Sequence, residues 1–259
     1  MSAAVPASLV GDQGAPPRAA SPRPAVRLAP MRRTLPLSLV LLAGCAATAD
    51  EVRLPLDAPP EAPLAAGTFD CTDPGVFGWS ERFGGGLALT GRADYAPPHR
   101  SPLAIALLDG LEFRSFELEA DLLQSGREYG HRDLCLFLGF QAPDRYYYVH
   151  MATTPDQNAH NVFLVDGAPR RNLIAPRERG VDWGQEEWHH VRLVRDVDAG
   201  TIRVWFDDME TRVLEAEDRT LEWGRVGFGS FDDEGMIRDL RIRSAESRPV
   251  DRAGSPFAR

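Results

Sequence analysis

The sequence predicts an all-β protein folded as a two-sheet antiparallel sandwich over about residues 68–245. Three observations carry this prediction. The region is divided into short apolar runs separated by turn residues, and strands of this length and spacing are typical of sandwiches. The chain contains 23 glycines and 21 prolines, which favour turns over long helices. After residue 45, no apolar stripe of helical period extends over three turns.

The alternation of side chains justifies the expected strands in order. In residues 115–122 the apolar side chains take every second position and the acids Glu117, Glu119 and Asp121 lie between them, as in a strand with one buried face. Residues 201–207 alternate in the same way, and Gly200 before them ends a hairpin-turn signal. The expected strands cover residues 103–108, 115–122, 134–140, 146–152, 161–166, 188–195, 201–207, 225–230 and 237–243.

The N-terminal part of the chain carries the pattern of a secretion signal. Arg32 and Arg33 form a short basic region, residues 34–43 form an apolar core too short to cross a bilayer, and Leu-Ala-Gly lead to Cys45. This order resembles the lipobox of bacterial lipoproteins, in which the cysteine becomes the lipidated first residue. We expect residues 1–30 to be an extension upstream of the true start at Met31, and residues 31–44 to be the signal peptide.

The resemblance to lipoproteins implies an extracytoplasmic protein that a lipid on Cys45 anchors to the bacterial envelope. Because alanine rather than aspartate follows Cys45, the outer membrane is the expected location. Residues 45–67 are rich in alanine and proline and are expected to be the lipidated cysteine and a flexible tether. Residues 68–245 are then the folded domain, and residues 246–259 a disordered tail.

Charge and cysteine content exclude several classes of function. All 29 basic residues are arginines, which rules out lysine Schiff-base chemistry and a phosphate-binding loop lysine. The net charge of −9, or −13 for residues 45–259 alone, makes nucleic acid an improbable partner. No serine-hydrolase elbow, zinc-protease helix motif or Cys-x-x-Cys pair is present. Cys71 and Cys135 either pair in an oxidising compartment or remain free, with Cys135 buried.

Two segments resemble a known superfamily. Trp188-His189-His190-Val191, followed after a turn by Ile202-x-Val204-Trp205-x-Asp207, is similar to concanavalin A-like and laminin-G-like jelly rolls. The glycine-rich run at 224–230 is similar to the same group, and residues 111–122 resemble an early strand of bacterial secreted domains related to 3-keto-disaccharide hydrolases. The resemblance implies a jelly-roll sandwich. It implies little about activity, because this superfamily includes lectins, glycosidases, polysaccharide lyases and adhesive modules.

The densest polar cluster lies between residues 127 and 161 and suggests a glycan site. With a period of two, Tyr146, Tyr148 and His150 share one strand face, opposite the more apolar Tyr147, Val149 and Met151. We expect the first set to line the concave groove, where aromatic rings stack on sugars and polar groups bind hydroxyls. The predicted ligand-binding residues are Asp133, Tyr146, Tyr148, His150, His160, Asn161 and Trp183.

Two other functions stay open at this point. A glycoside hydrolase or polysaccharide lyase would use His131 or His150 as the base and a tyrosine such as Tyr148 as the acid. A structural envelope lipoprotein would need no site, and the tyrosines would then be ordinary strand residues while the histidines cap loops. Trp183 has the alternative role of packing beneath a loop.

Clustered acids raise the question of a metal and of a second catalytic site. Asp232 and Asp233 offer oxygen ligands for a structural Ca²⁺, although adjacent acids in a turn are more often only solvated. Glu117, Glu119 and Asp121 share one strand face, but their order differs from the Glu-x-Asp-x-Glu strand of retaining jelly-roll glucanases, so a solvated acidic face is the expectation. Calcium is thus the one cofactor that the sequence suggests.

Overall fold

The computed structural model describes residues 50–54, 56, 68–250 and 254–257. The predicted signal peptide, Cys45 and most of the predicted tether lie outside these residues. The described part is almost entirely β-structure, with two short 3-10 helices, η1 (Pro74–Val76) and η2 (Arg82–Gly84). Within the described residues, no helix is long and apolar enough to cross a membrane. The strands pair in antiparallel fashion.

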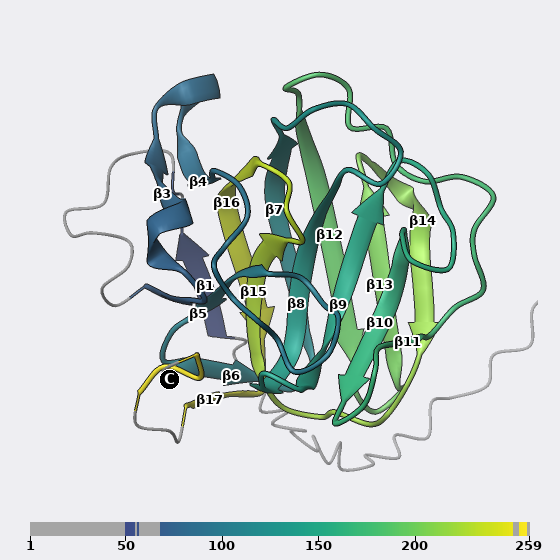
Figure 1. Ribbon diagram of the computed structural model, residues 1–259. Helices are drawn as coiled ribbons and strands as arrows, with labels where there is room; N and C mark the ends of the chain where they lie inside the picture. The colour runs from purple at the N-terminus through teal and green to yellow at the C-terminus, as the bar shows by residue number, and fades with distance from the viewer. Residues whose placement is uncertain (1–49, 55, 57–67, 251–253, 258–259) are drawn as a thin grey trace, which may run out of the picture. The chain divides into compact units, whose positions relative to one another are not determined.

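Two large sheets face each other (Figure 1). The first has eight strands, in the order β14 (Asp208–Glu217), β13 (Thr201–Phe206), β12 (Trp188–Asp196), β7 (Phe116–Gln124), β16 (Gly235–Ser244), β4 (Gly86–Leu89) and β3 (Phe77–Ser80), with β1 (Asp50–Leu54) also paired to β16. The second has seven, in the order β11 (Arg171–Asn172), β10 (Asn161–Asp166), β9 (Arg145–Ala152), β8 (Asp133–Ala142), β15 (Arg225–Ser230), β5 (Ala104–Leu108) and β2 (Phe69–Cys71). A small ribbon pairs β6 (Leu111–Phe113) with β17 (Ser247–Pro249).

The predicted sandwich is confirmed. Each of the nine expected runs forms a strand, and the runs at 161–166 and 225–230 match β10 and β15 at both ends. Each sheet places late strands beside early ones: β16 lies next to β7, and β15 lies between β8 and β5. This crossed connectivity is that of a jelly roll.

The main hydrophobic core fills the space between the sheets. From Phe116 to Leu122, every second residue of β7 is buried there, and β9 contributes Tyr147, Val149 and Met151. The predicted division of β9 into two faces is therefore confirmed. Gly229 of β15 lies so close to β5 that a Cβ atom would sit 1.9 Å from the Ala104 carbonyl oxygen, which explains a glycine at this position of the run at 224–230.

The acids of β7 are neutralised by basic side chains on the neighbouring strands. Glu117 pairs with Arg192 at 2.6 Å and with Arg243 at 3.1 Å, and Asp121 contacts His190 at 3.0 Å. These contacts join β7 to β12 and β16 across the outer face of the eight-stranded sheet. The expected acidic face is thus a network of cross-strand ion pairs.

Cys71 and Cys135 do not form a disulfide. Cys71 is on β2 and packs against the main core, whereas Cys135 is on β8, three strands away, and points to the other face of the same sheet. Adjacent strands lie about 4.8 Å apart, so the two thiols are too distant to bond. Burial raises the pKa of the Cys71 thiol to about 12.

Two segments outside the expected domain limits also contribute. β1 lies within the predicted tether and extends the eight-stranded sheet. β17 and Phe257 lie within the predicted tail, and the Phe257 ring packs edge-on against Phe140 with centroids 5.5 Å apart. The sequences of both segments show no sustained alternation, which is why they are not predictable as strands.

Candidate functional site

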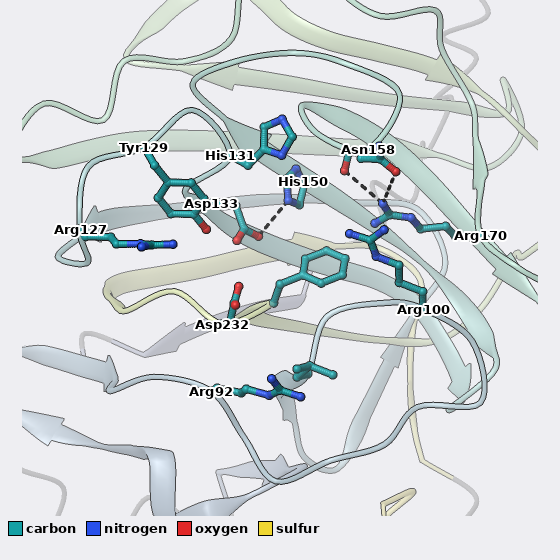
Figure 2. A pocket seen from close by; sticks show the side chains of 12 residues that line it. Arg92, Arg100, Arg127, Tyr129, His131, Asp133, His150, Asn158, Arg170 and Asp232 are labelled. Carbon is teal, nitrogen blue, oxygen red and sulfur yellow. Dashed lines mark hydrogen bonds and ion pairs between the residues drawn. The ribbon is translucent and has the colours of Figure 1, made fainter.

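A cavity of about 310 Å³ lies on the outer face of the seven-stranded sheet (Figure 2). Three parts of the chain meet there: the connection from β4 to β5, the region from the loop before β8 to the loop after β10, and the turn after β15. The lining side chains are Arg92, Arg100, Leu103, Arg127, Tyr129, His131, Asp133, His150, Asn158, Arg170, Phe231 and Asp232.

The pairing of β8 with β9 creates the floor of the cavity. Cys135 lies opposite His150 in the antiparallel register, and alternation puts Asp133 on the same outer face as Cys135. From the polar cluster noted between residues 127 and 161, the side chains of His131, Asp133 and His150 line the cavity.

Asp133 and His150 form a buried pair. His150 Nε2 lies 3.2 Å from Asp133 Oδ2, and His150 Nδ1 accepts a hydrogen bond from the backbone N–H of His160 at 3.1 Å. The second bond fixes the neutral tautomer with its proton on Nε2. Burial and the nearby Arg170 lower the pKa of His150 well below its usual value. With both ring nitrogens occupied, His150 positions Asp133 and offers no free nitrogen to a ligand.

Asp133 is the centre of a buried hydrogen-bond network. Its carboxyl group accepts bonds from the Cys135 thiol at 2.9 Å and the Ser230 hydroxyl at 2.8 Å, in addition to His150. Its backbone N–H donates to Asp233, which also accepts from the Tyr129 hydroxyl at 2.7 Å. Burial, with Asp233 close by, raises the pKa of Asp133 well above its ordinary value.

The structure separates the two predicted calcium ligands. Asp232 is exposed and lines the cavity, whereas Asp233 is buried and its Oδ2 atom accepts the two bonds just described. In the described part of the chain, the group able to offer three metal ligands is Asp133, Cys135 and His150, whose ligand atoms lie within 4.8 Å of one another. These atoms are hydrogen-bonded among themselves, so a cation would have to replace those bonds. Calcium at Asp232 and Asp233 stays a prediction.

The expectation that Tyr146 and Tyr148 line an open groove is wrong. Both side chains are fully buried, in a second hydrophobic cluster on the outer face of the seven-stranded sheet. Tyr148 stacks on Phe163 at 4.9 Å and Tyr146 stacks on Phe140 at 4.8 Å. Phe257 packs over this cluster, which a strand pattern alone does not reveal. Neither ring is available to stack on a sugar.

Tyr148 nevertheless contributes to the cavity through Arg170. Arg170 Nη1 donates to the Tyr148 hydroxyl at 2.6 Å, and Nη2 donates to the backbone oxygen and Oδ1 of Asn158 at 3.3 and 3.2 Å. The guanidinium also lies over the rings of Phe163 and Phe231, at 4.5 and 5.2 Å from their centroids. Cation–π contacts and hydrogen bonds together fix its position at the wall of the cavity.

His131 is the cavity imidazole that remains accessible. Its Nε2 lies 2.9 Å from Asp156 Oδ2, and 46% of its side chain is exposed. Tyr129, two residues earlier, lines the same cavity and has its pKa raised by burial and by the bond to Asp233. An imidazole oriented by a carboxylate is the arrangement of a general base.

Three other predicted ligand-binding side chains lie away from the cavity. The Asn161 amide bonds to the backbone of Ile174 and holds the loop after β11. Trp183 is fully buried in the main core, where Nε1 donates to the Met151 carbonyl. Only the backbone of His160 reaches the site, because its side chain is buried close to Val213 and Arg177. All three side chains therefore have structural roles. For Trp183, a packing role was the alternative given in the sequence analysis.

His160 makes folding stability depend on pH. Burial and, less strongly, Arg177 lower its pKa from 6.5 to about 4. Between these values the unfolded chain binds a proton that the folded chain does not, so stability falls as the pH is lowered. Asparagine suits the left-handed φ of 51° at this position, so His160→Asn is the variant that tests this. Between pH 7 and pH 4, its free energy of unfolding is expected to fall by about 3 kcal/mol less than that of the parent protein.

Urea unfolding of both proteins at several pH values measures this difference directly. The raised pKa values of Asp133 and Asp233 act in the opposite direction, but they are common to both proteins and cancel in the comparison. Parallel pH profiles for the two proteins would contradict the assignment.

Sequence reasoning missed three arginines of the cavity. Arg92 and Arg100 come from the irregular segment between β4 and β5, and Arg170 from the loop between β10 and β11. Loop residues follow no strand period, so their position in space cannot be read from alternation. The available signal was only compositional: in a chain without lysine, any cationic site must consist of arginines.

No protein-family model and no curated protein matches this chain. Among solved structures, it is similar to a carbohydrate-binding module from Bacillus subtilis described as CBM66 (13% identity, TM-score 0.49, 68% of this chain and 96% of that one). Winged bean acidic lectin, solved with methyl-α-D-galactose, gives 12% identity and a TM-score of 0.49 over 78% of this chain and 100% of that one. A Bacillus subtilis protein of unknown function with a galectin-like fold gives 13% identity and a TM-score of 0.48 over 79% of this chain and 100% of that one. Similarities this distant transfer no ligand and no activity to this chain.

Proposed function

We propose that this chain is a glycan-binding jelly-roll module, exported and anchored to the bacterial envelope by a lipid on Cys45. The observation that carries the glycan proposal is the cavity of about 310 Å³ on the outer face of the seven-stranded sheet. Its wall combines two half-buried aromatic rings, Tyr129 and Phe231, with side chains that donate and accept hydrogen bonds. An aromatic ring can stack on the apolar C–H face of a sugar, and polar groups beside it can bind the sugar's hydroxyls.

The sequence supports the location in this proposal. The basic pair at Arg32 and Arg33, the apolar core and the residues before Cys45 follow one another in the order of a lipoprotein signal. Mass spectrometry of the N-terminus, made on the membrane fraction of expressing bacteria, tests it. A diacylated peptide that begins at Cys45 supports the anchor, and an unmodified N-terminus upstream of Met31 contradicts it.

A second candidate is a glycoside hydrolase or polysaccharide lyase. It is favoured by one observation, the His131–Asp156 pair at the cavity, with Tyr129 beside it. In that case His131 is the general base. The other predicted catalytic residues, His150 and Tyr148, are buried, and both ring nitrogens of His150 are engaged inside the protein.

One experiment separates the two functions. The full chain and its His131→Ala variant are both screened on a broad glycan panel. Binding is measured first, and turnover is then measured as the release of reducing ends or unsaturated products. His190→Ala is the matched control, because His190 is similarly exposed (43%) and also bonds an aspartate, but on the other sheet.

A binding module is expected to show binding without turnover and a loss of a few-fold in affinity for His131→Ala. An enzyme is expected to show turnover that falls by ~10²-fold or more in His131→Ala and is unchanged in His190→Ala. Neither binding nor turnover on any glycan would contradict both functions and leave a structural envelope lipoprotein.

A further inference from the structure

Four arginine side chains line the cavity: Arg92, Arg100, Arg127 and Arg170. In Figure 2, Arg127 lies at one end of the cavity and Arg100 and Arg170 at the other. In the described part of the chain, none of the four forms an ion pair with a carboxylate, although most of the other arginines there do. Guanidinium groups without a carboxylate partner, gathered at one cavity, form a site for an anion.

Arg170 is the most firmly held of these four. Tyr148 and Asn158 fix two of its nitrogens, and its Cζ atom lies over the rings of Phe163 and Phe231. A guanidinium carries five N–H donors, so donors remain for a ligand. Because the surrounding groups already order this side chain, little rotamer entropy is lost when it binds.

The acids of the cavity do not cancel this positive charge. Asp133 is buried, its oxygens accept three hydrogen bonds, and its pKa is raised by burial. Asp232 is the one exposed carboxylate among the lining residues. Four guanidinium groups thus face one exposed carboxylate, in a chain whose net charge is −9.

We infer that the cavity binds an acidic sugar, one that carries a carboxylate or a sulfate group. This inference rests on the proposed glycan-binding function and specifies its ligand. Arg100 and Arg170 bind the acidic group, for which the fork of a guanidinium has matching geometry. Since the rest of the protein is strongly negative, it repels long polyanions, and the preferred ligand is a short acidic oligosaccharide or the end of a chain.

Calorimetric titration of the full chain with four probes tests this inference. The probes are a galacturonic acid trisaccharide, a sulfated disaccharide, a neutral galactose trisaccharide and sodium sulfate. At least one acidic saccharide is expected to bind ten-fold or more tightly than the neutral trisaccharide, and its affinity is expected to fall as salt is added. The two acidic probes show which anionic group is preferred.

Variants connect this binding to the arginines. Arg100→Gln and Arg170→Gln are each expected to lower the affinity for the acidic saccharide about ten-fold or more, and to lower the affinity for the neutral trisaccharide by a clearly smaller factor. Arg100 is exposed, so its replacement does not threaten folding. Arg241→Gln is the matched control, because Arg241 is also exposed and its replacement removes the same charge from β16 of the other sheet.

Each contrary outcome has a distinct meaning. Equal affinity for neutral and acidic saccharides, unaffected by Arg100→Gln, would overturn the acidic-sugar inference and leave glycan binding intact. Sodium sulfate binding as tightly as the acidic saccharides would overturn it in favour of a free anion. Binding of no saccharide would contradict the glycan-binding function itself.

Discussion

Replacement of Trp183 by alanine is expected to lower the free energy of unfolding by about 4 kcal/mol. Trp183 is fully buried, its Nε1 donates to the Met151 carbonyl at 3.2 Å, and its ring meets Phe206 edge-on with centroids 5.0 Å apart. The substitution opens a large cavity in the main core and leaves the Met151 carbonyl without this donor. Urea unfolding with linear extrapolation measures the loss.

Trp205→Ala is the matched control for this prediction. Trp205 lies on β13, outside the core and half-buried, with the Arg192 guanidinium 4.9 Å from its ring centroid. Its loss is expected to lower stability by less than about 2 kcal/mol, since less apolar surface is buried there. The structural role of Trp183 would be wrong if Trp183→Ala kept the stability of the parent and instead lost saccharide binding.

The second large effect is expected at Asp133. Removal of this side chain by Asp133→Ala leaves the donors of His150, Cys135 and Ser230 without their acceptor inside the protein. We expect a loss of about 3–5 kcal/mol in the free energy of unfolding, the usual result of deleting one partner of a buried polar network.

Asp133→Asn provides the control for this loss. In this variant the amide oxygen still accepts hydrogen bonds from His150 and Cys135. The amide N–H donates to Ser230 Oγ, an atom that also accepts a bond from the backbone N–H of Asp233. Because the raised pKa of Asp133 favours its neutral form, asparagine resembles it, and a loss of less than about 1.5 kcal/mol is expected. Equal stability of Asp133→Ala and the parent in urea unfolding would show that the network contributes nothing.

The strands and their faces were predictable because burial imposes a period of two. The clearest case is β7, where a simple alternation of apolar and acidic residues indicated both the strand and its buried side. β14 escaped prediction because it is an edge strand with charged side chains, such as Glu210 and Arg212, and a register shift opposite Trp205. Its edge position needs few apolar residues, so the sequence shows no clear alternation there.

The site was predictable only where strands define it. Asp133 and His150, two members of the polar cluster between residues 127 and 161, both lie at the cavity. Alternation could not show that Phe257, from the end of the chain, packs on the second hydrophobic cluster and that Tyr146 and Tyr148 are buried there. Nor could it bring Arg100 and Arg170 together, since the contact between two irregular segments depends on the complete fold.

A crystal structure of the full chain with a bound acidic oligosaccharide tests the central claim most directly. The sugar is predicted to occupy the cavity beside Phe231, with its carboxylate or sulfate within hydrogen-bonding distance of Arg100 or Arg170. A saccharide bound elsewhere, for example over the ion pairs on the outer face of the eight-stranded sheet, with the arginine-lined cavity empty, would contradict it.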